Sequence, residues 1–173
     1  MGLLRFLGIG ASGGGAENRG ETETVRRIAA ELERLPPDKA KYLAAFAYVL
    51  ARIANADLSI DAHETAEMER IARRIAGLQG SEATLVVEIA KSQARTLGGT
   101  QDYIVTREFR DIATREQRGE LLQCLYAVAA ADGTISTAES AEIIAIAEEL
   151  GFTRAEANSL RGAYRDKLAE FQR

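Results

Sequence analysis

Oxygen-bearing side chains recur at alternate positions in two short stretches of this sequence. The first stretch carries Asp57, Ser59 and Asp61 and closes with Glu64. The second stretch carries the matching set Asp132, Thr134, Ser136 and Glu139. Calcium loops supply carboxylate, carbonyl and other oxygen ligands at nearly every second position and close with a glutamate. The pattern therefore predicts a site for Ca²⁺ or another divalent cation, and the first stretch is favoured because it has three carboxylates against two.

The spacing differs from that of an EF-hand. Each stretch spans eight residues, whereas the EF-hand loop has about twelve, with a glycine in its middle. A turn this short offers few oxygens. A hard cation bound there would need water, or ligands from elsewhere in the fold, to complete its coordination shell.

Helix capping is the alternative interpretation of both stretches. The ranges 60–64 and 135–139 each run Ile, a capping residue, two others and Glu. A side chain such as Asp or Ser caps a helix N-terminus, and a Glu three residues later completes a capping box, with a preceding apolar residue as a staple. Capping alone therefore accounts for the Ile, the Asp or Ser, and the Glu in each copy.

Asp57 and Asp132 are not explained in this way. Each stands at the predicted C-terminal end of a helix, where the helix dipole disfavours an anion. Two groups are able to compensate that charge. One is the set of free N–H groups at the start of the following helix, and the other is a bound cation.

The two stretches belong to an internal repeat with a constant offset of 75 residues and no gaps. Between residues 46 and 76, ten of 31 positions are identical to their partners in the second copy. The identical positions of the first copy are Leu50, Ala54, Ala56, Asp57, Ile60, Glu64, Ala66, Glu67, Ile71 and Ala72. Two copies favour a single domain with pseudo-twofold symmetry, because a solenoid needs three or more repeats.

The elements that position these stretches are predicted to be helices, which makes the fold class all-α. Apolar residues make up 46% of the chain and charged residues 28%, and the apolar positions follow the helical period. We expect a compact bundle of seven to eight helices, with capping boxes at Thr114, Ser136 and Thr153. The expected helices cover residues 21–35, 38–56, 61–77, 81–97, 101–112, 114–131, 136–151 and 153–173.

Residues 1–20 differ from the helical domain predicted for residues 21–173, in which the two repeats lie near 38–78 and 114–152. Five large apolar residues precede a glycine-rich stretch: Leu3, Leu4, Phe6, Leu7 and Ile9. One interpretation is a disordered tail. The other is a docking peptide that inserts into a membrane surface or a partner's groove, with the glycines as a flexible tether.

Several classes of function are disfavoured by the composition. A net charge of −4 without a basic cluster gives no footprint for nucleic acid. Cys124, the single cysteine, excludes an internal disulfide and is predicted to lie in the core, while His63 is predicted to lie on the surface. No nucleophile and base, Walker loop or zinc cluster is evident, so we expect a protein that is not an enzyme.

The string ADGTIS followed by Glu139, together with its counterpart ADLSID before Glu64, resembles the TerB-like family associated with tellurite resistance. The resemblance covers most of residues 38–167. It implies an all-helical, cytosolic protein near the inner membrane, a role in metal or oxidant stress complexes, and a divalent-cation site using Asp57, Glu64, Asp132 and Glu139. The expected function is a non-enzymatic adaptor that binds a cation and docks to partner proteins or a membrane surface. The alternative is an interaction module whose acidic turns are only caps.

Overall fold

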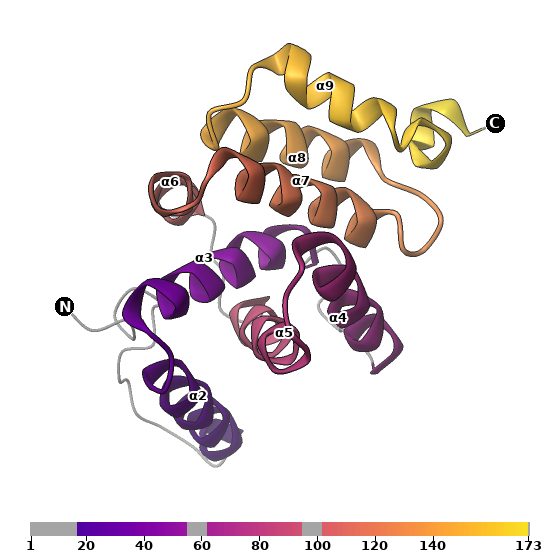
Figure 1. Cartoon of the computed structure of the whole chain (residues 1–173). Coiled ribbons are helices and arrows are strands. Elements are labelled where there is room, and N and C mark those ends of the chain that lie inside the picture. The colour runs from indigo at the N-terminus through magenta and orange to yellow at the C-terminus, as the bar shows by residue number, and fades with distance from the viewer. Residues whose placement is uncertain (1–16, 55–61, 95–101, 173) are drawn as a thin grey trace.

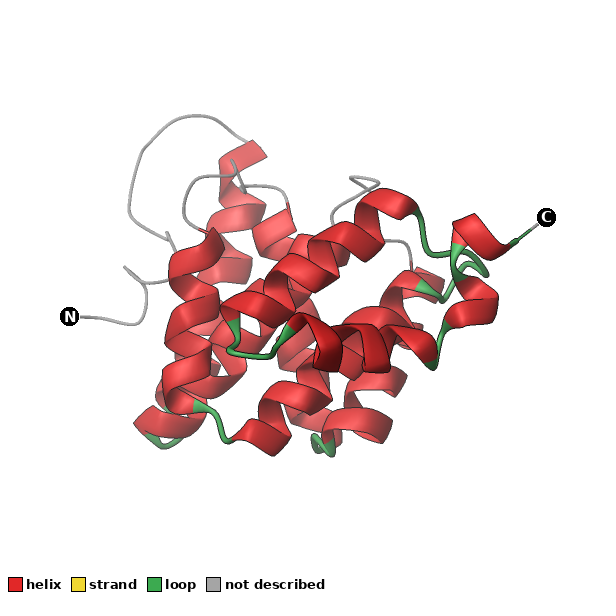
Figure 2. Ribbon diagram, turned by 90° about the horizontal axis from the view of Figure 1, so that it is seen from above, coloured by secondary structure: helices red, strands yellow, loops and turns green. Residues whose placement is uncertain are grey.

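The structure is a computed structural model, which describes residues 17–54, 62–94 and 102–172. The described residues form α-helices and no strand, as Figure 2 shows in a view from above. The helices are α2 (Glu17–Glu33), α3 (Pro37–Ala54), α4 (Ala62–Ala76), α5 (Gly80–Ala94), α6 (Asp102–Ile112), α7 (Arg115–Ala129), α8 (Thr137–Glu149) and α9 (Arg154–Gly162). The predicted all-α class, with seven to eight helices, is confirmed for this part of the chain.

Helix α3 is the central element of the fold. It lies across the middle of the molecule, with α2, α4 and α5 on one side and α6 to α9 on the other (Figure 1). It packs against α5, α6 and α7. Its residues are buried nearly all round, from Ala40 to Ile53, because a helix surrounded by other helices has no solvent face to keep polar.

The internal repeat is visible in the order of the helices. Helix α3 ends at Ala54 and α7 at Ala129, while α4 begins at Ala62 and α8 at Thr137, so both boundaries keep the offset of the sequence repeat. Buried residues from both copies form one continuous apolar core. Helix α4 of the first copy packs against α7 of the second. The two copies therefore share a core rather than forming two separate units.

Most predicted helix boundaries agree with the structure to within a few residues. Thr114, Ser136 and Thr153 each cap a helix, and each has a complete capping box. Helix α2 begins at Glu17, earlier than the predicted start at residue 21. The second of the two prolines, Pro37, is the first residue of α3, a position that needs no hydrogen bond from its nitrogen.

One predicted element is wrong. The last helix was expected to run to the C-terminus, but α9 ends at Gly162 and is followed by two short 3₁₀ turns, η2 (Arg165–Lys167) and η3 (Ala169–Phe171). Between these turns Leu168 is 2% exposed and forms a parallel bridge with Ile135. A continued α-helix would be unable to form that main-chain pair, so tertiary contact overrides helix propensity here.

Membrane-spanning helices were also searched for among the described residues. No helix there combines the length and apolar character needed to cross a bilayer.

Candidate functional site

The second acidic turn, which connects α7 to α8, is described completely. The N–H of Gly133 donates to the carbonyl oxygen of Ala130 at 2.9 Å, and Gly133 adopts a φ of +100°. This left-handed conformation is strained for any residue with a side chain. The glycine thus turns the chain sharply at the end of α7, so that the residues after it face back toward the start of α8.

Asp132 is stabilised within this turn. Its Oδ1 accepts a hydrogen bond from the N–H of Thr134 at 3.1 Å, which is the local arrangement that Asp favours in turns. The sequence left two explanations for this carboxylate, the free N–H groups of the next helix or a bound cation. The observed donor is instead the turn residue two positions later, so the position of Asp132 has a local explanation.

Ser136 and Glu139 form the capping box of α8. The N–H of Glu139 donates to Ser136 Oγ at 3.1 Å, and the N–H of Ser136 donates to Glu139 Oε2 at 2.8 Å. Ile135, just before the cap, is fully buried. The capping interpretation is therefore confirmed for the second copy, where each of these polar side chains accepts a hydrogen bond that holds the helix start.

Residues 164–172, here called the C-terminal segment, are docked against this turn. The N–H of Ile135 donates to Lys167 O at 2.7 Å, and the N–H of Ala169 donates to Ile135 O at 2.9 Å. Gln172 accepts a hydrogen bond from Thr134 Oγ1 at 2.6 Å and donates through Nε2 to Gly133 O at 2.9 Å. The hydroxyl of Thr134, one of the predicted cation ligands, is thus engaged by the C-terminal segment.

The first acidic turn lies mostly outside the described residues. This applies to Asp57, Ser59 and Asp61, whereas Glu64 is described and exposed in the first turn of α4. The predicted docking residues of the N-terminal peptide, between residues 3 and 9, also lie outside. Among the residues that the structure does describe, no three His, Cys, Asp or Glu side chains gather in a way that suits a metal ion.

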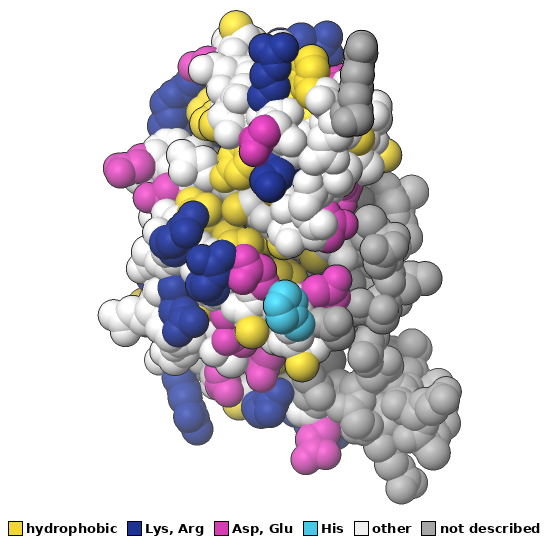
Figure 3. Space-filling model, turned by 90° about the vertical axis from the view of Figure 1, so that its right-hand side faces the viewer, with side chains coloured by type: hydrophobic (Ala, Val, Ile, Leu, Met, Phe, Trp, Pro, Cys, Tyr) yellow, Lys and Arg dark blue, Asp and Glu magenta, His cyan; other side chains and the backbone are white. Residues whose placement is uncertain are grey.

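Two further predictions concern His63 and Cys124. His63 is exposed, and the histidine in Figure 3 lies at the surface beside acidic side chains. Cys124 is 1% exposed, and burial, followed by the nearby charge of Glu120, raises the pKa of its thiol to about 12. A thiol with such a pKa is almost entirely protonated at neutral pH and is a poor nucleophile, so its assignment to the core is confirmed.

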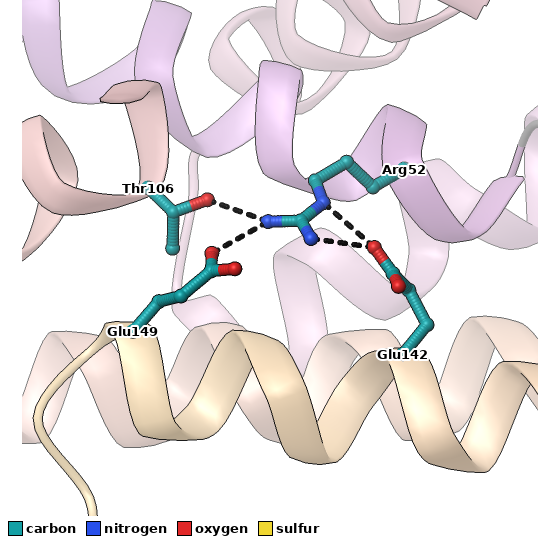
Figure 4. Close-up of polar contacts among 4 residues, drawn as sticks. All are labelled: Arg52, Thr106, Glu142 and Glu149. Atoms are coloured by element: carbon teal, nitrogen blue, oxygen red, sulfur yellow. Dashed lines mark hydrogen bonds and ion pairs between the residues drawn. The ribbon is translucent and has the colours of Figure 1, made fainter. Parts of the chain in front are cut away.

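The sequence analysis missed a buried ionic cluster centred on Arg52, near the end of α3 (Figure 4). Its Nε and Nη2 donate to Glu142 Oε1 at 3.0 and 2.5 Å. Its Nη1 donates to Glu149 Oε2 at 2.7 Å and to Thr106 Oγ1 at 2.9 Å. The guanidinium thereby joins α3, α6 and α8, and it connects the helix that leads into the first turn with the helix that leaves the second.

Burial gives this cluster its character. The Arg52 side chain is 7% exposed, against 42% for Glu142 and 24% for Glu149. Burial alone would lower the pKa of Arg52, but its hydrogen bonds to Glu149 and Glu142 outweigh that effect and raise it. The signal available in the sequence was a single charged residue in the apolar run YVLARIA, at a position where the second copy has Ala127.

Comparison with known protein families agrees with the helical fold and the repeated turn. The model of the family described as "Tellurite resistance protein TerB" matches residues 43–162. The chain belongs to the TerB family. The match to TerB contains α4 to α9 and both acidic turns, and it ends where α9 ends, at Gly162. No curated protein and no solved structure matches the chain.

The TerB assignment confirms the resemblance drawn from the two turn motifs. The C-terminal segment that covers the second turn begins after the matched region. Its contacts with Ile135, Thr134 and Gly133 are therefore features of this chain to be considered in addition to the TerB core.

Proposed function

We propose that this TerB-family protein is a non-enzymatic adaptor that binds other proteins. The observation that supports the proposal best is the use made of the second turn. Both main-chain groups of Ile135 are paired with a separate, extended piece of chain. Main-chain pairing with an extended segment is a general mode of peptide recognition, so this turn already acts as an attachment point within the molecule.

We further propose that a divalent cation, with Ca²⁺ as the first candidate, binds at the first acidic turn. In the second turn one oxygen of Asp132 and one of Glu139 accept backbone N–H groups, and Thr134 is bonded to Gln172. Those contacts leave the second turn fewer oxygens for a cation. The first turn has Asp61 where the second has Ser136, which adds a carboxylate to the ligand set of Asp57, Ser59 and Glu64.

A calcium titration followed by thermal unfolding tests the cation. A ligand that binds only the folded state stabilises it by about 2.7 kcal/mol at a concentration of roughly 100 times its Kd. We expect the melting temperature to rise with Ca²⁺ and to return to its starting value when a chelator is added. An unchanged melting temperature at saturating Ca²⁺ and Mg²⁺ would instead favour the interaction module whose acidic turns are only caps.

The place of action is proposed from the N-terminal sequence. Its cluster of large apolar residues between Leu3 and Ile9 supports docking to a partner groove or to the cytoplasmic face of the inner membrane, as does the TerB resemblance. Deletion of residues 2–10 followed by cell fractionation tests this proposal. We expect the deleted protein to leave the membrane or complex fraction, and an unchanged distribution would contradict the docking role.

A further inference from the structure

Residues 164–172 form a segment with one buried anchor. Leu168 is 2% exposed, whereas Arg165, Asp166, Glu170 and Gln172 are exposed, and Phe171 is 47% exposed. The rest of the attachment is polar: two main-chain hydrogen bonds to Ile135, the contacts of Gln172, and an ion pair from Arg161 to Glu170. A segment with few buried apolar contacts, at the end of a chain, opens locally at lower cost than the core unfolds.

Opening this segment uncovers a surface with defined recognition chemistry. Ile135 presents one N–H donor and one C=O acceptor, now taken by Lys167 and Ala169. Beside them is the apolar position filled by Leu168, and at the turn lie the Thr134 hydroxyl and the Gly133 carbonyl. These are the elements of a site for an extended peptide: main-chain hydrogen bonds for affinity and a side-chain pocket for specificity.

A buried polar group at the base of the segment argues that the docked state is not an optimal closure. The ring of Tyr126 stacks on Tyr164, with centroids 5.4 Å apart and an interplanar angle of 17°. Tyr126 is 1% exposed, and its hydroxyl has no hydrogen-bond partner among the described residues. A buried hydroxyl without a partner weakens the arrangement that encloses it, which favours replacement of the segment.

We propose that the C-terminal segment is an internal ligand and that the surface beneath it is a docking site for an extended peptide of a partner protein. The partner peptide carries a leucine-like aliphatic side chain in the place of Leu168 and pairs with Ile135 through its main chain. This inference rests on the proposed adaptor function and names the kind of partner that the second turn accepts. The chain's own segment excludes that partner until it is displaced, which makes the segment an autoinhibitory contact.

The test uses the full chain and a labelled probe peptide, YRDKLAEFQR, which has the sequence of residues 164–173. Leu168→Ala in the chain removes the internal anchor, and Phe171→Ala is the matched control because it removes a large exposed side chain from the same segment. In the wild type, the tethered segment competes at a high effective concentration. Fluorescence anisotropy should therefore show probe binding to the Leu168→Ala chain at least tenfold tighter than to the wild-type or Phe171→Ala chains.

A second probe with Asp in place of its leucine should not bind to any chain. Equal binding of both probes, or no probe binding to a Leu168→Ala chain that still unfolds cooperatively, would overturn the proposal. Concentration-dependent dimers of the wild-type chain that exchange the segment would identify a second copy as the occupant and would overturn the assignment to a partner peptide.

Hydrogen exchange of the wild-type chain keeps the proposal testable if Leu168→Ala fails to fold. The amides of Ile135 and Ala169 should exchange at least tenfold faster than core amides such as that of Leu125, because local opening releases them. Exchange of all three at the rate of global unfolding would overturn the proposal. Both experiments are done without Ca²⁺, so a failed cation titration and a failed peptide test are separate results, and the N-terminal deletion tests adaptor function independently.

Discussion

Replacement of Arg52 tests how much the buried cluster contributes to stability. In Arg52→Ala the guanidinium is lost, and the four hydrogen bonds that it donates to Glu142, Glu149 and Thr106 are lost with it. Both carboxylates remain between α3 and α8 without their counter-charge. We therefore expect the free energy of unfolding to fall, with the size of the loss set by how far the carboxylates regain contact with water.

The exposed fractions of the side chains set the magnitude. Removal of one partner from a fully buried ion pair costs about 3–5 kcal/mol. Glu142 is 42% exposed and Glu149 24% exposed, so solvent screens the charges that remain and reduces the loss to about 2–3 kcal/mol. Arg52→Lys should recover only part of this loss, since an ammonium is unable to reproduce the planar fork that reaches both carboxylates.

Arg70→Ala is the matched control. Arg70 also donates through Nε and Nη2 to a single glutamate, Glu67, but its side chain is 51% exposed. Urea unfolding followed by circular dichroism should show a lower midpoint for Arg52→Ala at an unchanged m-value, and no measurable change for Arg70→Ala. Equal effects of the two substitutions would refute the claim that burial makes the Arg52 cluster stabilising.

Three further predictions concern single side chains. Ser136→Ala should lower the free energy of unfolding by about 1 kcal/mol in urea titrations, because it removes the N-cap of α8; an unchanged midpoint would contradict the importance of this cap. Burial alone would raise the pKa of Glu82, but its hydrogen bonds to Lys39 and to the Gln79 N–H lower it below 4.5. The stability from Glu82 is then present above pH 4.5 and lost as the pH falls further, so Glu82→Gln should flatten the stability profile below pH 4.5, and a parallel profile would argue against these bonds. Cys124, with a pKa raised to about 12, should react with iodoacetamide at pH 8 only in unfolding concentrations of urea; rapid reaction of the folded protein would contradict its burial.

Local features of the fold could be predicted from the sequence. The capping boxes at Thr114, Ser136 and Thr153 depend on residues three positions apart, so a short window contains all the necessary information. The repeat also predicted that α4 and α8 begin at equivalent positions. The same locality explains why the capping interpretation of Glu139 was sound.

Features that depend on distant contacts could not be predicted in this way. The partners of Arg52 lie 90 and 97 residues away in the sequence, and no periodicity connects them. The end of α9 at Gly162 depends on Leu168, whose burial comes from its pairing with Ile135. The local donor to Asp132 was missed because the charge of the helix end was considered without the conformation that Gly133 gives to the turn.

The most direct test of the account is calcium binding by two equivalent variants, Asp57→Asn and Asp132→Asn, measured by isothermal titration. Each replaces a carboxylate with an amide of nearly the same shape, and in the second turn the amide oxygen is still able to accept the Thr134 N–H. We predict that Asp57→Asn abolishes calcium binding, while Asp132→Asn binds like the wild type. Loss of binding in Asp132→Asn with binding retained in Asp57→Asn, or no binding by the wild type, would contradict the assignment of the cation to the first turn.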